Sequence, residues 1–309
     1  MRQRTTVRSA ITGKDSSRVR TCLIGLVLCL PCLPSAASTI DVCQEPAAES
    51  HLSVGYFDYE TSPFERSLGT SDRENFSTDL QFRLNSNWLL GGGHRSEILN
   101  VDGLDLQTNG YLHTFFFPVY WVNRSDEKSF QFSIAPALSA SSNVTGDPGE
   151  YTSDALQILA SVVWGRQISD RLGLRYGVCA DHRFGGYRVY PLISANWQPH
   201  PDWRIELGFP SSQVTYRVTD RLASSLRIAP NGNEWYVKDK SLQRHSQLVH
   251  EAYVLEWQFN WRAHEHFMLT ASVGREFHSR YELTLQDESS VRLSSDPANR
   301  VGVALAWLF

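Results

Sequence analysis

From residue 51 onward, apolar and polar side chains alternate along the chain with a period of two. In the clearest run, Tyr253, Leu255, Trp257, Phe259 and Trp261 fall on one face, and the residues between them are mostly polar. Successive side chains of a strand point to opposite faces, so this run predicts a strand with one aromatic and one polar face. The same alternation recurs in 76–84, 130–138, 172–179 and 301–309.

The pattern predicts fourteen strands, which lie at 51–60, 75–84, 88–97, 110–122, 129–140, 154–168, 171–182, 187–198, 203–209, 213–219, 222–230, 248–262, 266–277 and 299–309. Short connections alternate with longer ones, and the longer ones are 61–74, 98–109, 141–153, 231–247 and 278–298. This alternation is typical of an outer-membrane barrel, in which tight periplasmic turns face longer outer loops. The connections 183–186 and 210–212 are too short for outer loops, so twelve strands is the alternative.

Strand length and aromatic placement favour a barrel in lipid over a soluble sandwich, which also alternates. Many predicted strands have about ten residues, the length that a tilted strand needs to cross a bilayer. Aromatic side chains gather at strand ends, as they do in the girdles of membrane barrels. The tryptophans concerned are Trp88, Trp121, Trp164, Trp197, Trp203, Trp261 and Trp307.

The N-terminal region has the order of features of a secretion signal. A basic segment precedes a short apolar run at 22–31, and small residues follow at 34–38. We therefore expect a removed signal peptide at 1–37, a flexible periplasmic tail at 38–50 and a barrel at 51–309. Residues 1–37 hold six basic residues and one acid, which leaves 23 basic and 32 acidic residues, or −9, on the rest. This charge argues against nucleic-acid binding.

Two of the five cysteines, Cys43 and Cys179, lie outside the predicted signal. An exported compartment permits a disulfide between them. Because Cys43 lies in the predicted tail and Cys179 in a predicted strand, two separate thiols is the favoured interpretation.

The chain ends on Phe309, in register with the apolar face of the last predicted strand. A final strand that ends in an aromatic residue resembles the signal read by the barrel-assembly machinery of outer membranes. We therefore expect that machinery, through Phe309, and outer-membrane lipid to be partners of the chain.

Several short segments together resemble an uncharacterised bacterial family of outer-membrane β-barrels, a family of unknown function. The segments are 190–197, Leu207-Gly-Phe-Pro210, Val214-Thr-Tyr-Arg217 and Asp220-Arg-Leu222, and Gly274-Arg275 and the last strand are compatible with them. The resemblance spans 75–309. It implies the barrel fold and carries over no activity.

The sequence offers weak candidates for hydrolase chemistry. His245-Ser246 and His278-Ser279 are adjacent pairs, but neighbours on a strand point to opposite faces. Asp181-His182 is similar to the acid–histidine pair of outer-membrane proteases, with Glu150 and Asp154 as further carboxylates. The cluster His264-Glu-His266 has two metal-ligand side chains, whereas zinc sites use three or four. None of these predicts a catalytic, metal or cofactor site.

Charged residues are predicted to point into the lumen, because Arg or Lys on the lipid face costs about 2–4 kcal/mol near the bilayer midplane. The predicted lining is Asp79, Arg83, Arg175, Arg188, Arg204, Glu206, Arg217, Arg227, Glu256 and Glu276. Such a lining either selects solutes in a pore or forms ion pairs that plug the interior.

The sequence thus predicts a single outer-membrane β-barrel of a Gram-negative bacterium, without catalysis or cofactor. Its expected function is a passive channel for small solutes or a structural barrel that presents surface loops. The alternative is an outer-membrane hydrolase acting on lipid or peptide.

Overall fold

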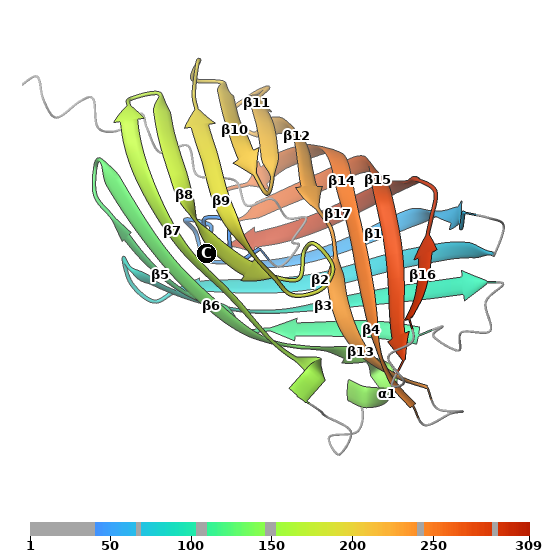
Figure 1. Cartoon of the computed structure of the whole chain (residues 1–309). Helices are drawn as coiled ribbons and strands as arrows, with labels where there is room; N and C mark the ends of the chain where they lie inside the picture. The colour runs from blue at the N-terminus through green and yellow to red at the C-terminus, as the bar shows by residue number, and fades with distance from the viewer. Residues whose placement is uncertain (1–40, 66–68, 103–109, 146–152, 240–243, 286–289) are drawn as a thin grey trace, which may run out of the picture.

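The computed structural model describes residues 41–65, 69–102, 110–145, 153–239, 244–285 and 290–309, so the predicted signal peptide at 1–37 lies outside the described residues. Within these ranges one antiparallel sheet curls round until its last strand pairs with its first, as Figure 1 shows. His51 lies opposite Leu308 and Tyr59 opposite Arg300 at this seam. The sheet is therefore a closed barrel, which confirms the predicted fold class.

The described residues form seventeen strands. They are β1 (His51–Pro63), β2 (Thr70–Arg83), β3 (Trp88–Asp102), β4 (Gly110–Phe116), β5 (Val119–Arg124), β6 (Lys128–Ser141), β7 (Leu156–Ser169), β8 (Leu172–Asp181), β9 (Arg188–Trp197), β10 (Trp203–Phe209), β11 (Ser212–Arg217), β12 (Leu222–Pro230), β13 (Asn233–Asp239), β14 (Arg244–His264), β15 (Phe267–Leu285), β16 (Ser290–Ser294) and β17 (Ala298–Leu308). A short helix α1 (Ser142–Thr145) and a 3₁₀ turn η2 (Ser153–Ala155) lie between β6 and β7.

Three of the wall strands are interrupted, so the described part of the barrel has fourteen wall strands, as predicted. β4 and β5 share the neighbours β3 and β6, β12 and β13 share β14, and β16 and β17 share β15. A proline stands in the first break, at Pro118, and it has no N–H to give to the ladder. Gly232 stands in the second break, where an added Cβ would lie 2.6 Å from the carbonyl oxygen of His250.

Alternation along the strands separates a lipid-facing surface from the interior. On β1, Leu52, Val54 and Tyr56 are exposed, while the residues between them are buried. The aromatic row of β14 also faces outward from Leu255 to Trp261. Tyr253, the N-terminal member of this row, is partly buried. Buried polar side chains fill the opposite, inner phase. This arrangement, apolar outside and polar inside, is that of a barrel in hydrocarbon.

Both ends of the wall lie at the same end of the barrel, where the backbone N–H of Phe309 donates to the carbonyl oxygen of Ser50 at 3.0 Å. The short connections 84–87, 125–127, 170–171, 198–202, 218–221 and 265–266 lie there too. Exposed tryptophans mark this end, among them Trp88, Trp197 and Trp307. No helix in the described ranges is long and apolar enough to span a bilayer.

The wall is far taller on one side than on the other. β14 has 21 residues and β15 has 19, whereas β10 has 7 and β11 has 6. Segments predicted as outer loops at 61–74, 231–247 and 278–298 therefore contain β-structure, because the tall strands continue beyond the apolar band. On the low side, β13 leans over and meets β6 in a parallel bridge between Tyr236 and Ala140. Ser139 Oγ and Gln157 Nε2 both donate to the carbonyl oxygen of Glu234 at 2.7 Å.

The lipid-facing band gives a direct test of the orientation. Val303 is an exposed residue within the apolar face of β17. We expect Val303→Arg to lower the free energy of unfolding by about 2–4 kcal/mol, because the guanidinium would enter hydrocarbon. The measurement is urea unfolding of the barrel in lipid vesicles, followed by tryptophan fluorescence.

Val291→Arg is the matched control, since Val291 lies on β16, where the wall rises beyond the apolar band. Its expected cost is about 0–1 kcal/mol. Equal costs for the two variants would contradict a membrane-spanning band on β17.

Candidate functional site

The segment 41–50 lies inside the barrel and makes contacts with the inner wall (Figure 1). Val42 and Cys43 are fully buried, and Ala47 is buried as well. The sequence predicted a flexible periplasmic tail at 38–50. The structure, which describes the chain from residue 41, places residues 41–50 inside the barrel instead. The composition of the segment, rich in small and polar residues, matches a loop but gives no sign of the surface that receives it.

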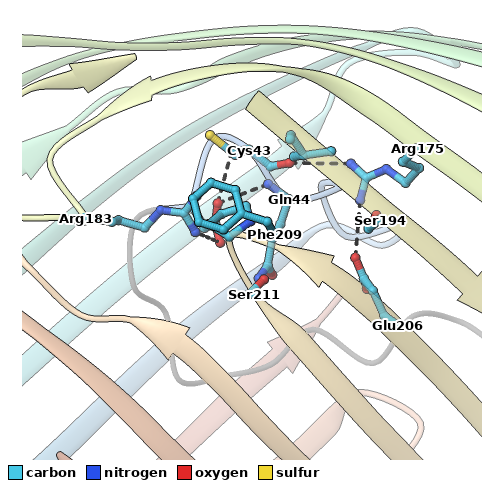
Figure 2. A pocket seen from close by; sticks show the side chains of 11 residues that line it. Cys43, Gln44, Arg175, Arg183, Ser194, Glu206, Phe209 and Ser211 are labelled. Carbon is cyan, nitrogen blue, oxygen red and sulfur yellow. Dashed lines mark hydrogen bonds and ion pairs between the residues drawn. The ribbon is translucent and has the colours of Figure 1, made fainter. Parts of the chain in front are cut away.

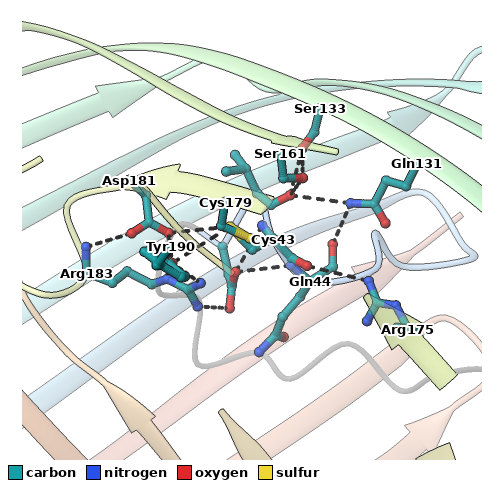
Figure 3. Close-up of a disulfide and its surroundings, with 12 residues drawn as sticks. Cys43, Gln44, Gln131, Ser133, Ser161, Arg175, Cys179, Asp181, Arg183 and Tyr190 are labelled. Atoms are coloured by element: carbon teal, nitrogen blue, oxygen red, sulfur yellow. Dashed lines mark hydrogen bonds and ion pairs between the residues drawn. A yellow bond between two sulfur atoms is a disulfide. The ribbon is translucent and has the colours of Figure 1, made fainter. Parts of the chain in front are cut away.

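Inward-facing side chains of the wall hold the backbone of this segment. The carbonyl oxygen of Val42 accepts hydrogen bonds from Ser133 Oγ at 2.7 Å and Ser161 Oγ at 2.8 Å. Gln131 Nε2 donates to the carbonyl oxygen of Gln44 at 3.0 Å. Figure 3 shows these donors, on β6 and β7, converging on the segment. No strand pairing holds residues 41–49, so the segment is bound to the inner surface of the wall and is not part of the sheet.

A disulfide joins the segment to the wall between Cys43 and Cys179 on β8. Their Cα atoms are 5.9 Å apart, within the ordinary range for disulfides. The favoured sequence interpretation, two separate thiols, was wrong because it placed Cys43 in a tail outside the barrel. The disulfide closes a loop with a sequence separation of 136 residues, so it restricts the unfolded chain strongly.

Next to the disulfide, buried charges fix the tip of the segment. The Asp41 carboxylate is ion-paired with Arg183, and its other oxygen accepts hydrogen bonds from the backbone N–H groups of Cys43 and Gln44, each at 3.1 Å. Arg183 also donates to Asp181 at 2.8 Å and to the Tyr190 hydroxyl at 2.7 Å. These groups satisfy one another, as buried charges must.

A second charged cluster lies in the taller part of the barrel. Arg73 donates to Glu276 at 2.5 Å and lies over the Tyr59 ring, 3.8 Å from its centroid. Asn231 Nδ2 donates to the same carboxylate at 2.7 Å, and His250 is stacked on Tyr281. A neighbouring ion pair joins Arg300 to Glu256. Positive and negative side chains thus form ion pairs inside the barrel, which is one of the two alternatives that the sequence left open for the lining.

The predicted lining residues fall into three groups in the structure. Arg227, Glu256 and Glu276 are buried within the charged clusters. Arg175 pairs with Glu206 at 3.7 Å, and the Asp79 carboxylate accepts a hydrogen bond from His51 Nε2 at 3.1 Å. The others lie nearer an edge of the wall: Arg83 donates to the carbonyl oxygen of Ala48, Arg217 pairs with Asp202, Arg204 is half-buried, and Arg188 is exposed.

Sequence reasoning missed several members of these clusters, namely Asp41, Arg73, Arg95, Glu97, Arg183, His250 and Arg300. Arg73 lies on a strand extension that was predicted as a loop, whereas Arg95, Glu97 and His250 lie near the ends of predicted strands. Extending the period-two phase of the strand at 75–84 by two residues would have placed Arg73 inside, and the phase of the strand at 88–97 already points Glu97 inward. Asp41 and Arg183 have no such signal, because neither lies on a strand.

The described residues contain no complete arrangement of catalytic side chains for a hydrolase. Ser279 Oγ lies 3.1 Å from His250 Nε2, but the nearest Glu276 oxygen, at 3.4 Å, faces the same ring nitrogen. A catalytic triad uses both ring nitrogens, one for the nucleophile and one for the acid. Asp181 and His182 also have separate partners, Arg183 and Glu234. Glu150 lies outside the described residues, and these residues contain no metal-binding cluster.

A small cavity lies between the segment and the low side of the wall, with room for about one water molecule. Its lining combines the segment, Arg175, Arg183, Glu206 and the hairpin tip Phe209-Pro210-Ser211. Figure 2 shows Arg175 and Glu206 facing each other there, with Phe209 and Ser211 nearby. The lining is thus mainly polar, and Leu192, Phe209 and Pro210 form its apolar part.

A closed barrel of fourteen antiparallel strands, apolar outside and polar inside, defines a transmembrane β-barrel. The sequence model described as "Domain of unknown function (DUF6268)" matches residues 129–304, which is more than half of the chain. The protein therefore belongs to this family, and the predicted membership in an uncharacterised barrel family is confirmed.

Solved structures with a similar fold are outer-membrane proteins of low sequence identity. An outer membrane channel from Pseudomonas putida F1 aligns at a TM-score of 0.47 and 9% identity, over 88% of this chain and 99% of that chain. The KdgM porin aligns at 0.36 and 8%, over 83% and 99%. The Pseudomonas putida toluene transporter TodX aligns at 0.35 and 10%, over 85% and 90%. No curated protein matches the sequence.

The buried pair of Arg73 and Glu276 gives a test of the charged interior. We expect Glu276→Gln to lower the free energy of unfolding by about 3 kcal/mol, because it leaves a buried guanidinium without its main carboxylate. Urea unfolding of the barrel in lipid vesicles measures this cost.

The matched control is Glu282→Gln on the same strand, whose partner Arg292 is largely exposed. It should cost no more than about 1 kcal/mol. If both variants are as stable as the parent, water reaches the Arg73–Glu276 pair, and the prediction of a strongly coupled buried pair is wrong.

Proposed function

We propose that this protein is a passive channel for small solutes in a bacterial outer membrane, closed at rest by residues 41–50. The location is supported by the outward apolar band and by the predicted secretion signal. The observation that carries the proposal is the position of the segment inside the lumen, tied to the wall by one disulfide and by side-chain contacts.

The way in which the segment is held supports a closing role. Wall strands exchange continuous backbone hydrogen bonds, and removing one would open the sheet. Residues 41–49 take no part in such a ladder, and they contact β6, β7 and β8 through Gln131, Ser133, Ser161 and Cys179. Asp41 reaches across to Arg227 of β12, 3.8 Å away. The segment spans the interior and can leave it with the wall intact.

The lining that would remain supports passage of polar solutes. Arg175, Glu206 and Arg227 line the space beside the segment, and serine and glutamine side chains that bind its backbone would become free donors. Rings of charged and polar side chains select solutes in such pores. Both signs are present, so we expect weak selectivity by charge.

Conductance across a planar bilayer tests the closing role. A variant that lacks residues 41–49 should give stepwise currents, because the lumen loses its occupant, whereas the parent should stay closed for most of the time. Reductant should make the parent open more often, since it breaks the tie between Cys43 and Cys179.

A variant with both Cys43→Ser and Cys179→Ser is the matched control, and its currents should not change with reductant. Equal currents from the parent and the shortened variant would show that the segment does not close the channel. Silence of both would leave a structural barrel, in which the charged networks themselves fill the interior.

A further inference from the structure

The Asp41 carboxylate is held by two arginines that come from distant parts of the barrel. One of its oxygens is ion-paired with Arg183, in the connection between β8 and β9, and lies 3.8 Å from Arg227 Nη2 on β12. Both arginines are buried, and the Asp41 side chain is only 7% exposed. Guanidinium groups offer several N–H donors and bind carboxylates strongly. The interior thus contains a carboxylate site that the segment itself fills.

The other two acids of the segment also bind arginines, at the end of the barrel that has the short connections. Glu45 is ion-paired with Arg124 on β5, and a Glu49 oxygen lies 3.4 Å from Arg262 on β14. Both pairs are partly exposed. Residues 41–50 include three acids and no Lys or Arg, so each carboxylate of the segment has an arginine partner.

Arginines bind the backbone of the segment as well. Arg83 Nε donates to the carbonyl oxygen of Ala48 at 2.9 Å, and Arg175 donates to that of Cys43 at 3.5 Å. Figure 3 shows Arg175 and Arg183 reaching the segment from two sides. In the described part of the chain, six arginines therefore contact residues 41–50 and form what we call the arginine row: Arg83, Arg124, Arg175, Arg183, Arg227 and Arg262.

The arginine row would have fewer acidic partners without the segment. Among the residues that the structure describes, Arg183 would keep Asp181 at 2.8 Å, and Arg175 would keep Glu206 at 3.7 Å. The three carboxylates of residues 41–50 would be lost together. The emptied path would therefore carry more positive than negative charge along the arginine row.

Two arginines of the row have unused donors even with the segment in place. The Nε atoms of Arg227 and Arg262 are buried and have no hydrogen-bond partner within the described ranges. Arg227 lies opposite Glu256 on β14, but that carboxylate is ion-paired with Arg300. Buried donors of this kind normally have an acceptor. The row is thus suited to a ligand that brings further carboxylate oxygens.

We propose that the arginine row binds small solutes with two or more carboxylates, and that the segment 41–50 is its built-in competitor. The proposal rests on the proposed channel function and deepens it, because it names a substrate class. Small inorganic ions sense both signs of charge in the lumen, whereas a solute with two carboxylates can bind two arginines at once. Such a solute would occupy the volume that residues 41–50 fill at rest, and not the small cavity beside them.

Replacing the Asp41 carboxylate with a free one tests the central site in the full chain. Asp41→Ala should lower the urea midpoint of unfolding in lipid vesicles, because two buried arginines lose a shared carboxylate. Formate, which matches the group removed, should raise this midpoint towards that of the parent. Formamide, which is neutral and of similar size, should not raise it.

Glu49→Ala is the matched control, since its partner Arg262 is partly exposed and formate should leave its midpoint unchanged. If formate shifts the parent and both variants equally, or shifts none of them, the site does not bind carboxylates and the proposal is wrong.

Thiol labelling tests whether a dicarboxylate displaces the segment. In Cys179→Ser, the Cys43 thiol is free of its disulfide but stays buried while the segment is bound. Succinate should raise the rate at which a water-soluble maleimide labels Cys43, because it binds the arginines only after the segment has left. The expected rise is about tenfold at ten times the succinate dissociation constant. Succinamide, the neutral analogue, should have no effect.

The variant with both Cys43→Ser and Cys179→Ser gives the background of the labelling. A rate that succinate leaves unchanged or lowers would overturn the proposal, even if the channel conducts. Because neither unfolding nor labelling needs a current, a silent conductance trace would refute the channel without deciding this site.

Discussion

In hydrocarbon, every backbone N–H and C=O group must find its partner within the protein, and this constraint shapes the whole molecule. It explains why the sheet closes through β1 and β17 and leaves no long edge. It also explains the treatment of the low side, where the ladder stops above β10 and β11. There the connection from β8 to β9 covers the two exposed edges, and Phe184 occupies the space that backbone pairing leaves.

The same surrounding lipid drives charge into the interior, and charge inside must then be paired. Two clusters result, one around Arg73 and Glu276 and one around Arg183 and Asp41. The first joins side chains of the wall only. The second contains two arginines, Arg183 beside Asp181 and Arg227, and Asp41 from outside the wall supplies a second carboxylate that contacts both. Electrostatics therefore gives the N-terminal segment a reason to enter the lumen.

The segment and an aromatic cluster of Phe184, Tyr190, Phe209 and Tyr253 are connected through consecutive residues. Arg183 binds Asp41, and its neighbour Phe184 packs against Phe209 and Tyr253. A movement of the segment would therefore bear directly on the position of Phe184. One connection of six residues, 182–187, thus supplies both the ion pair that holds the segment and the ring that packs beside it.

The sequence by itself determined the barrel, its fourteen strands and the inward phase of residues such as Glu256 and Glu276, because alternation is a local property of each strand. It overestimated the outer loops, since strands beyond the membrane alternate less clearly. Only the tertiary structure decided the position of residues 41–50, the disulfide to Cys179 and the aromatic packing around Phe184. These features join segments far apart in the chain, and no local periodicity records which distant surfaces meet when the sheet closes.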